Sequence, residues 1–349
     1  METALIFKIG LLSIISFLIA FFGTPVLTHF LYKYKFGKQI RDAKSAPVFA
    51  ALHKKKAGTP TMGGILIWAT VMFVTLLFYI ISYFFPDTFL GNLNFLTREE
   101  TLLPLGVFVL AAIVGLVDDY LGVRKIGPKG GGLSVVFRLS LYTMIAAVGA
   151  FWFYFKLDWD VLHIPFVGSY LVGWWYIPIF IFILVATAFS VNETDGLDGL
   201  AGGSMLSTFA ALGAITFAQG RFELAAFCGV IIGALLAFLW FNIPPARFFM
   251  GDTGSMSLGI TIGIIAMLTN TALLLPIIGL IFLMETLSVI VQLTSKKFRG
   301  KKIFRSTPIH HHFEAIGWSE PKIVMRAWLI SGVTAVAGVI IFLLDKGWY

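Results

Sequence analysis

The chain has 349 residues, of which 58% are apolar and only 13% are charged, and its formal net charge is +8. Soluble globular proteins carry roughly 25% charged residues, and no single water-soluble core could cover 35 Phe residues set against 18 acidic ones. These figures exclude a soluble enzyme and a disordered chain, and the lone Cys228 excludes a disulfide scaffold. The composition indicates a polytopic membrane protein.

Ten apolar segments are each long enough to cross a bilayer as a helix, for which about 20 mostly apolar residues suffice. They are too long and too uniformly apolar for barrel strands, and a backbone in lipid must satisfy its hydrogen bonds internally. The predicted spans are 5–32, 62–85, 101–117, 133–155, 171–191, 200–218, 223–241, 255–272, 274–293 and 327–345. The first lacks a basic leader and a small-residue cleavage site, so we expect it to be retained. The expected fold is all-α, one transmembrane domain over residues 1–349.

Ten spans would place both termini on one side of the membrane. Counted to the helix edges and including Arg138, the connections on the opposite side hold 21 of the 26 Lys and Arg residues. These connections are 33–61, 118–132, 192–199, 242–254 and 294–326. The positive-inside rule makes them cytoplasmic and both termini external. Membrane topology and binding to anionic lipid explain most of the basic residues. We do not expect a nucleic-acid partner, because no basic face outside the membrane is interleaved with aromatic residues.

The first cytoplasmic connection ends in three lysines, the last of them Lys56, followed by a Gly- and Thr-rich helix start over residues 58–64 that includes Thr61. Ammonium groups beside the free backbone N–H groups of a helix N-terminus suit a polyanion. A basic flank followed by a glycine loop would have the same composition, so this segment alone decides nothing.

The second connection opens with Asp118 and Asp119 at the predicted end of an uninterrupted apolar helix. Adjacent carboxylates repel each other, and the C-terminal end of a helix dipole disfavours negative charge. A cation would neutralise the pair, and Mg²⁺ takes hard oxygen ligands while keeping waters for substrate phosphates. The alternative is two solvated acids at the membrane edge.

The third connection contains Asn192, Asp195 and Asp198. If this turn is helical, the two aspartates at positions i and i+3 share a face.

The fourth connection contains Asn242, Phe249 and Asp252, and Asp252 stands directly before a predicted span. Asp252 could bind a metal there, or it could simply cap the helix.

The fifth connection carries three consecutive histidines, His310, His311 and His312. Consecutive side chains point in different directions, so the three cannot easily bind one metal, and without cysteine or a second histidine pair a zinc site is a poor interpretation. Imidazoles facing phosphate oxygens fit better. Acidic, basic and Gly-rich elements on one side therefore predict a Mg²⁺-assisted reaction on a polyphosphate, and the apolar body predicts a lipid as second substrate.

Taken together, these motifs resemble those of the polyprenyl-phosphate N-acetylhexosamine-1-phosphate transferases, and the likeness covers essentially the whole chain. The residues on which the resemblance rests are Asp118 to Tyr120, Asn192 with Thr194 to Leu200, Phe249 to Asp252, and Ile303 to Arg305 with Pro308 to Glu314. The segments Gly58 to Gly64 and Pro308 to His312 favour the muramoyl-pentapeptide branch.

This resemblance implies transfer of phospho-N-acetylmuramoyl-pentapeptide from UDP-MurNAc-pentapeptide to undecaprenyl phosphate, giving lipid I and UMP with Mg²⁺ in peptidoglycan synthesis. It also implies ten helices, external termini, a homodimer and an active site facing the cytoplasm of a bacterium. Whether an aspartate attacks first to form a covalent intermediate stays open.

Among the site residues, Asp252 is the expected principal Mg²⁺ ligand, with Asp118 or Asp119 contributing. Asp118 would accept the proton of the lipid phosphate or position that phosphate, and His311 would orient the pyrophosphate. Lys56, Asp198 and Phe249 would hold the uridine end, with stacking from Phe249. The rest of the expected substrate-binding set is Thr61, Asn192, Asp195, Asn242, His310 and His312.

Two positions depart from the family pattern. Gly122 stands where the family usually has a lysine, and Glu193 stands where it usually has an apolar residue. Arg124 or Lys125 would supply the missing charge.

Two other functions compete. A sibling transferase would use UDP-N-acetylglucosamine, and an ion-coupled transporter would place ionisable residues at mid-membrane. Only Glu285 lies well inside a predicted span, and we expect it to form a buried interhelical hydrogen bond.

Overall fold

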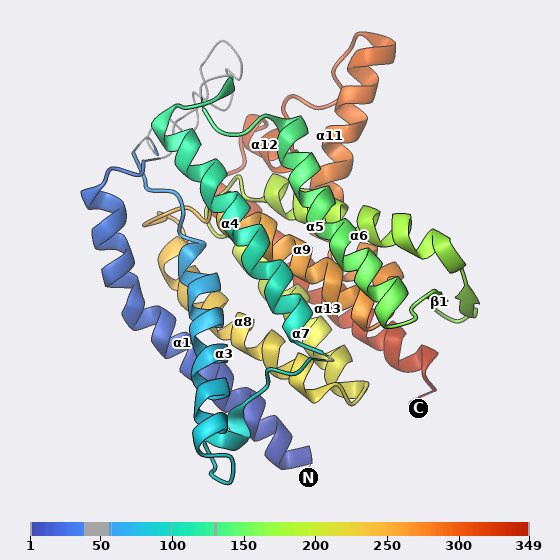
Figure 1. Ribbon diagram of the computed structural model, residues 1–349. Coiled ribbons are helices and arrows are strands. Elements are labelled where there is room, and N and C mark those ends of the chain that lie inside the picture. Colours follow the sequence, from blue (N-terminus) through green and yellow to red (C-terminus); the bar gives the residue numbers. More distant parts are fainter. Residues whose placement is uncertain (1, 38–55, 57, 99, 129–130, 348–349) are drawn as a thin grey trace.

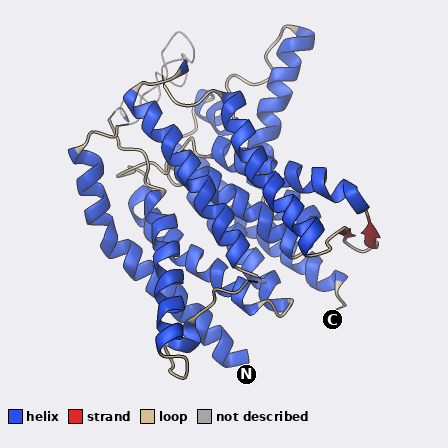
Figure 2. Ribbon diagram, in the orientation of Figure 1, coloured by secondary structure: helices blue, strands red, loops and turns tan. Residues whose placement is uncertain are grey.

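The computed structural model describes residues 2–37, 56, 58–98, 100–128 and 131–347. The described chain is a bundle of helices, as predicted (Figures 1 and 2). Its longer helices are α1 (Glu2–Lys33), α3 (Ile65–Phe84), α4 (Leu102–Arg124), α5 (Val135–Lys156), α6 (Tyr176–Thr194), α7 (Leu200–Ala218), α8 (Phe222–Asn242), α9 (Asp252–Leu268), α11 (Leu280–Arg299) and α13 (Glu320–Asp345). The shorter elements are η2 (Gly91–Leu93), β1 (Val161–Ile164), β2 (Gly168–Leu171), η4 (Gly173–Trp175), η5 (Ala272–Leu274), α10 (Leu275–Ile278) and α12 (Ile309–Ala315).

Eight helical segments of the described chain are long and apolar enough to cross a membrane. A ninth would be the pair Ala272–Ile278 and Leu280–Arg299, which is bent by 87° where the two helices join. Helix α9 has 17 residues and is shorter than the other predicted spans. The prediction of a polytopic all-α membrane protein is therefore confirmed, with eight or nine candidate spans.

Helix α9 lies at the centre of the bundle. Every residue from Thr253 to Leu268 is buried, and the helix packs against α3, α4, α6 and α7. Small residues permit this packing, because a Cβ at Gly259 or Gly263 would come within 2.7 Å of α6 atoms. The N-terminal end of α9, which begins at Asp252, is thereby held among the ends of several other helices.

Figure 1 shows α12 at one end of the bundle, while α1 begins and α13 ends at the other end. Helix α4 ends and α5 begins on the α12 side, and α11 projects from the bundle beyond the bend (Figure 1). The acidic, basic and histidine motifs of the sequence thus lie at the end opposite the described termini.

A short β-hairpin was not predicted. Strands β1 and β2 pair antiparallel with Val161 opposite Leu171, so the helix expected from residue 171 begins only at Tyr176. His163 of this hairpin binds Asp345 at the end of α13 (Nε2–Oδ2 2.6 Å). This contact fastens the hairpin to the last helix.

Candidate functional site

Helices α4 and α9 cross at Gly115, and this crossing brings two of the predicted catalytic aspartates together. A Cβ at Gly115 would lie 2.5 Å from the backbone carbonyl of Asp252, so only glycine allows the approach. Asp118 follows one turn later on α4 and is buried. Because a helix repeats about every 3.6 residues, Asp118 lies on the face that meets Asp252.

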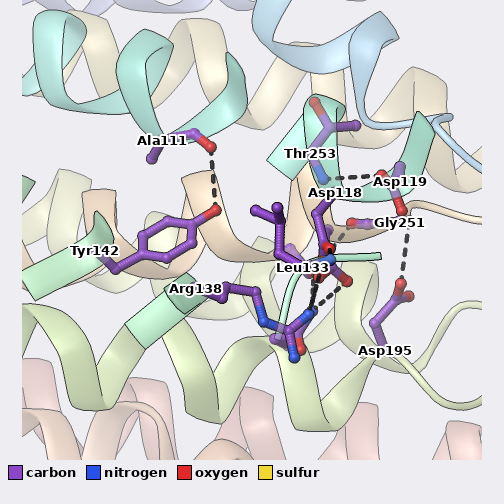
Figure 3. A network of polar contacts seen from close by, with 12 residues as sticks. Ala111, Asp118, Asp119, Leu133, Arg138, Tyr142, Asp195, Gly251 and Thr253 are labelled. Atoms are coloured by element: carbon purple, nitrogen blue, oxygen red, sulfur yellow. Dashed lines mark hydrogen bonds and ion pairs between the residues drawn. The ribbon is translucent and has the colours of Figure 1, made fainter. Parts of the chain in front are cut away.

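Arg138 of α5 forms ion pairs with both aspartates, and Figure 3 shows its pair with Asp118. Its Nη1 donates to Asp118 Oδ2 at 2.8 Å and also to Asp252 Oδ2. The backbone N–H of Leu133 donates to the other oxygen of Asp118 (2.5 Å), and Asn192 Nδ2 donates to Asp252 Oδ1 (2.9 Å). The single positive charge of the guanidinium lies between two carboxylates and offsets part of their mutual repulsion.

Arg138 was counted in the sequence only as a charge that reports topology. Its position one turn into an apolar helix was the signal that it faces a carboxylate, since an unpaired cation there is costly. That Arg124 or Lys125 replaces the charge of the lysine missing at position 122 stays a prediction. Arg124 lies over the Tyr120 ring, with its Cζ 5.5 Å from the ring centroid, and Lys125 ends α4 in a left-handed conformation.

The expectation that Asp118 and Asp119 end their helix was wrong. Helix α4 continues to Arg124, and Asp118 lies on its buried face. The unfavourable interaction of these carboxylates with the C-terminal end of the helix dipole therefore does not arise. The positive charge of Arg138 offsets the repulsion that acts on the Asp118 carboxylate.

Gly251 is the point at which three predicted site residues converge. Its φ is +74°, and a Cβ there would overlap Asp119 Oδ2 and lie 2.7 Å from Thr61 Oγ1. Asp195 Oδ2 accepts the Gly251 N–H at 3.2 Å, and Asp119 Oδ2 accepts the N–H of Thr253 at 3.1 Å (Figure 3). Asp252 is the first residue of α9, and because its N-cap residue Gly251 has no side chain, Asp119 of α4 binds the first-turn N–H instead.

The Gly-rich segment binds the backbone just before Asp252. Phe249 N–H donates to the Pro60 carbonyl, Gly63 N–H to the Phe249 carbonyl and Gly64 N–H to the Met250 carbonyl, each at 2.8 Å. The expectation that these helix-start N–H groups are free for a polyanion is therefore wrong for Gly63 and Gly64. Their role is to fix the loop that carries Phe249.

Lys56 forms a separate charged cluster on the same side. Its Nζ lies 2.6 Å from Asp198 Oδ1 and 2.5 Å from Glu320 Oε1, and 5.9 Å from the centroid of the Phe249 ring. The N–H of Asp198 also donates to Glu320 Oε1 (2.7 Å). The structure thus brings together Lys56, Asp198 and Phe249 as expected and adds Glu320, which the sequence analysis missed because α13 was predicted to start later. The neighbouring Lys54 and Lys55 lie outside the described residues.

Asp195 and Asp198 do not share a helical face. Helix α6 ends at Thr194 and α7 begins at Leu200, so the segment between them is a turn. Asp195 binds Gly251, whereas Asp198 binds Lys56 and the N–H of Ala246 (3.0 Å). This turn connects the aspartate cluster with the lysine cluster.

Asn242 is buried, and both ends of its amide bind the backbone. Oδ1 accepts the Gly199 N–H at 2.9 Å and Nδ2 donates to the Phe248 carbonyl at 2.8 Å. Asn242 therefore braces the loops on which Asp198 and Phe249 stand.

The three histidines point to three different partners, as expected for consecutive residues. His310 Nδ1 lies 2.9 Å from Glu285 Oε2, and His311 Nδ1 lies 2.7 Å from Glu314 Oε2. His312 Nδ1 accepts the Arg305 N–H at 3.2 Å. Glu285 thus forms the expected buried interhelical bond.

The two ring nitrogens of His310 differ in their surroundings. Nδ1 binds Glu285, while Nε2 is buried and has no hydrogen-bond partner among the described residues. Burial has the largest single effect and would lower the pKa of His310, but the carboxylates of Glu285, Glu314 and Glu193 together outweigh it and raise the pKa above its usual value.

The donor set of the aspartate cluster fits a magnesium ion, although no group of three His, Cys, Asp or Glu side chains in the described chain forms a ready metal cage. Mg²⁺ is commonly held by one or two carboxylates, with waters and substrate phosphates completing the shell. Asp118 and Asp252 share the cationic Arg138, so their carboxylate oxygens lie close enough together to bind a common cation in place of that guanidinium.

Comparisons with known proteins agree on these segments. A model of glycosyl transferase family 4 matches residues 101–270, and signature 1 of the phospho-N-acetylmuramoyl-pentapeptide-transferases matches residues 56–67. The chain is 40% identical over 324 residues to the phospho-N-acetylmuramoyl-pentapeptide-transferase of Chloroflexus aggregans, covering 89% of this chain and 83% of that protein. It is also 40% identical to the enzymes of the same name from a Geobacillus species, over 94% of this chain and 96% of the relative, and from Bacillus anthracis, over 94% and 95%.

Proposed function

Since the chain belongs to the phospho-N-acetylmuramoyl-pentapeptide-transferase family, we propose that its aspartate, lysine and histidine clusters divide that reaction among them. The chain transfers phospho-N-acetylmuramoyl-pentapeptide from its UDP carrier to undecaprenyl phosphate, giving lipid I and UMP. The observation that supports the division is the turn between α6 and α7, which joins the aspartate cluster at Asp195 to the lysine cluster at Asp198.

In the proposed reaction an oxygen of the lipid phosphate attacks the donor phosphorus that carries the sugar, and the bond between the two donor phosphates breaks to release UMP. A phosphate oxygen needs little activation, so positioning and charge neutralisation carry the catalysis. Asp118 would receive the lipid phosphate, or its proton, because it lies beside Arg138 and is shielded from solvent. The guanidinium would help to neutralise the phosphate that Asp118 positions.

We assign Asp252 as the principal Mg²⁺ ligand, with Asp118 or Asp119 contributing. Asn192 would fix the carboxylate orientation of Asp252 through its 2.9 Å hydrogen bond. Bound there, the ion would neutralise charge on the pyrophosphate and the leaving UMP.

The uridine end of the donor is assigned to Lys56, Asp198 and Phe249. Lys56 is already held by two carboxylates beside the Phe249 ring, so a base stacked on that ring would meet a fixed ammonium group. His311 would orient the pyrophosphate. The sugar-proximal region is assigned to Thr61, Asn192, Asp195, His310 and His312, with Asn242 bracing the loops.

An apolar groove beside the site suits the lipid acceptor. It runs along α6 and the bend between α10 and α11, and its lining includes Ser190, Val191, Pro276 and Phe282. Ser190 and Val191 directly precede Asn192, so a polyprenyl chain in the groove would bring its phosphate to the aspartate cluster.

The topology completes the proposal. We count α9 and the bent α10–α11 pair as spans, which makes ten, and place the described termini outside and the site on the cytoplasmic face. The basic residues and the common side of the two chain ends support this orientation (Figure 1). The family resemblance supports a homodimer.

One experiment tests the activity. Purified protein is incubated with undecaprenyl phosphate and radiolabelled UDP-MurNAc-pentapeptide, with and without Mg²⁺, and the labelled lipid is separated from the donor. A labelled lipid that forms only with Mg²⁺ is expected. A lipid product from UDP-N-acetylglucosamine but not from the muramoyl donor would replace this function with that of the sibling transferase.

A further inference from the structure

Glu285 is a buried carboxylate that the proposed reaction does not use. It lies on α11 shortly after the 87° bend, and it is 4% exposed. One of its oxygens, Oε2, binds two groups of His310: the backbone N–H at 3.3 Å and the ring nitrogen Nδ1 at 2.9 Å. A single carboxylate therefore fixes both the start of α12 and the orientation of the His310 ring.

The bond to Glu285 also fixes the tautomer of His310. An ionised carboxylate only accepts hydrogen bonds, so Nδ1 must carry a hydrogen. The other nitrogen, Nε2, faces Gly196 in the turn between α6 and α7, and a Cβ at position 196 would overlap it. Because residue 196 has no side chain, Nε2 packs directly against the backbone of the turn that carries Asp195 and Asp198.

The charged groups around His310 come from three helices. Glu285 of α11 has the strongest effect, Glu314 of α12 and Glu193 of α6 add further negative potential, and the His311 ring lies 4.0 Å away between centroids. All three carboxylates favour the imidazolium form. In that form Nε2 carries a hydrogen that has no acceptor among the described residues, and a buried donor without an acceptor is destabilising.

We propose that Glu285 is a positioning residue that holds His310 as an imidazolium against the Gly196 turn, beside the segment that is proposed to bind the nucleotide donor. This inference rests on the proposed function. The positive ring would attract the anionic donor across the turn, and the reaction would require the protonated ring. Carboxylates commonly orient functional imidazoles in this way.

The test compares Glu285→Gln, which keeps the shape and removes the charge, with Glu285→Asp, which keeps the charge. The pH dependence of kcat/KM for UDP-MurNAc-pentapeptide is measured for each. An opposite charge in contact shifts a pKa by about 1 unit or more. We therefore expect Glu285→Gln to lower, by about 1 pH unit, the pH at which activity is lost on the alkaline side of the profile. In that pH range kcat/KM should be roughly tenfold lower than in the wild type. Glu285→Asp should restore the wild-type pH profile.

Gln292→Leu is the matched control on the same helix. Gln292 braces the following loop through hydrogen bonds with Ile303 and Phe304 (2.9–3.0 Å), so its loss should lower the melting temperature without moving the pH limb. If Glu285→Gln only lowered the melting temperature in the same way, with an unchanged pH limb, Glu285 would be a structural ion pair and the inference would fail.

A second measurement does not depend on activity. In protein labelled with ¹⁵N-histidine, the His310 signal is assigned by its loss in His310→Gln and titrated in wild type and Glu285→Gln. A lower His310 pKa in the variant is expected, and an unchanged one would overturn the inference. Absence of lipid I formation by the wild-type protein at every pH would instead refute the proposed function.

Discussion

Asp118 and Asp252 bind the same nitrogen of Arg138, although the two aspartates lie on helices far apart in the sequence. The shared guanidinium occupies the place where a divalent cation would neutralise the pair. Arg138 and a bound metal should therefore balance the same negative charge.

Replacing Arg138 with methionine should lower the melting temperature without metal and enlarge the rise that Mg²⁺ produces. The variant removes the guanidinium that binds both carboxylates, and a ligand stabilises the folded state by an amount that grows with its affinity. Thermal unfolding in detergent over a Mg²⁺ series measures both effects. Arg124→Met is the control, because Arg124 contacts the Tyr120 ring. Equal Mg²⁺ responses in wild type and Arg138→Met would contradict the shared site.

Replacing Asp252 with asparagine preserves its shape and removes its charge. Turnover should fall by at least ~100-fold, the loss of a few kcal/mol of transition-state charge stabilisation. Steady-state kinetics across a Mg²⁺ series checks this. Near-normal turnover with unchanged Mg²⁺ dependence would leave Asp252 only the structural role of binding Arg138 and Asn192.

Substitutions of Asp118 and His311 should impair the reaction in different ways. Asp118→Asn should lose turnover and still bind UDP-MurNAc-pentapeptide, because its proposed partner is the acceptor phosphate. His311→Ala should lower kcat and kcat/KM together, as expected for a contact made mainly in the transition state. Donor binding, turnover and melting temperature are measured on the same purified samples.

The result for His311→Ala has a clear alternative. His311 binds Glu314 on the same short helix, so the substitution could affect only the stability of that helix. Full specific activity with a lower melting temperature would then show a structural role. Loss of donor binding in Asp118→Asn would place Asp118 on the donor side.

Labelling from outside the cell should reveal the orientation of the chain. In a background with the buried Cys228 replaced, cysteines at Lys55 and Gly300 should be shielded from an impermeant thiol reagent, while one at Asn92 should react. Gly300 and Asn92 lie in the described chain, and Lys55 lies outside it. The reverse labelling pattern would move the active site to the external face.

The stability of the protein should fall as the pH rises above neutrality, in part because of His310. Glu285 raises the pKa of His310 in the folded state, and an unfolded histidine titrates near pH ~6.5. The stabilisation is therefore fully present below that value and is lost as the pH rises through the folded pKa. Melting temperatures from pH 6 to 9 should decline less steeply in Glu285→Gln. An identical slope in both proteins would exclude this contribution.

The lengths and composition of the apolar segments determined that the chain is an all-α membrane protein, because a backbone in lipid has few other ways to satisfy its hydrogen bonds. The motifs also predicted Asp118, Asp252 and Lys56 as site residues, and the structure places these three in two charged clusters at one end of the bundle. Their residue types and spacing are local properties, and these can be read along the chain. The partners of these residues cannot be read in that way.

Only the tertiary structure decided those partners. Arg138 looked like a topological charge and Glu320 like the flank of a later helix, yet each completes a cluster whose other members come from distant segments. The Gly-rich segment looked ready for a phosphate, but Gly63 and Gly64 bind the loop before Asp252. In each case the partner was set by a contact between segments that are distant in the sequence. One such contact is the crossing of α4 and α9 at Gly115, where the absence of a Cβ lets the two helices meet. Such contacts depend on how the helices pack against one another, and no local pattern in the sequence specifies that packing.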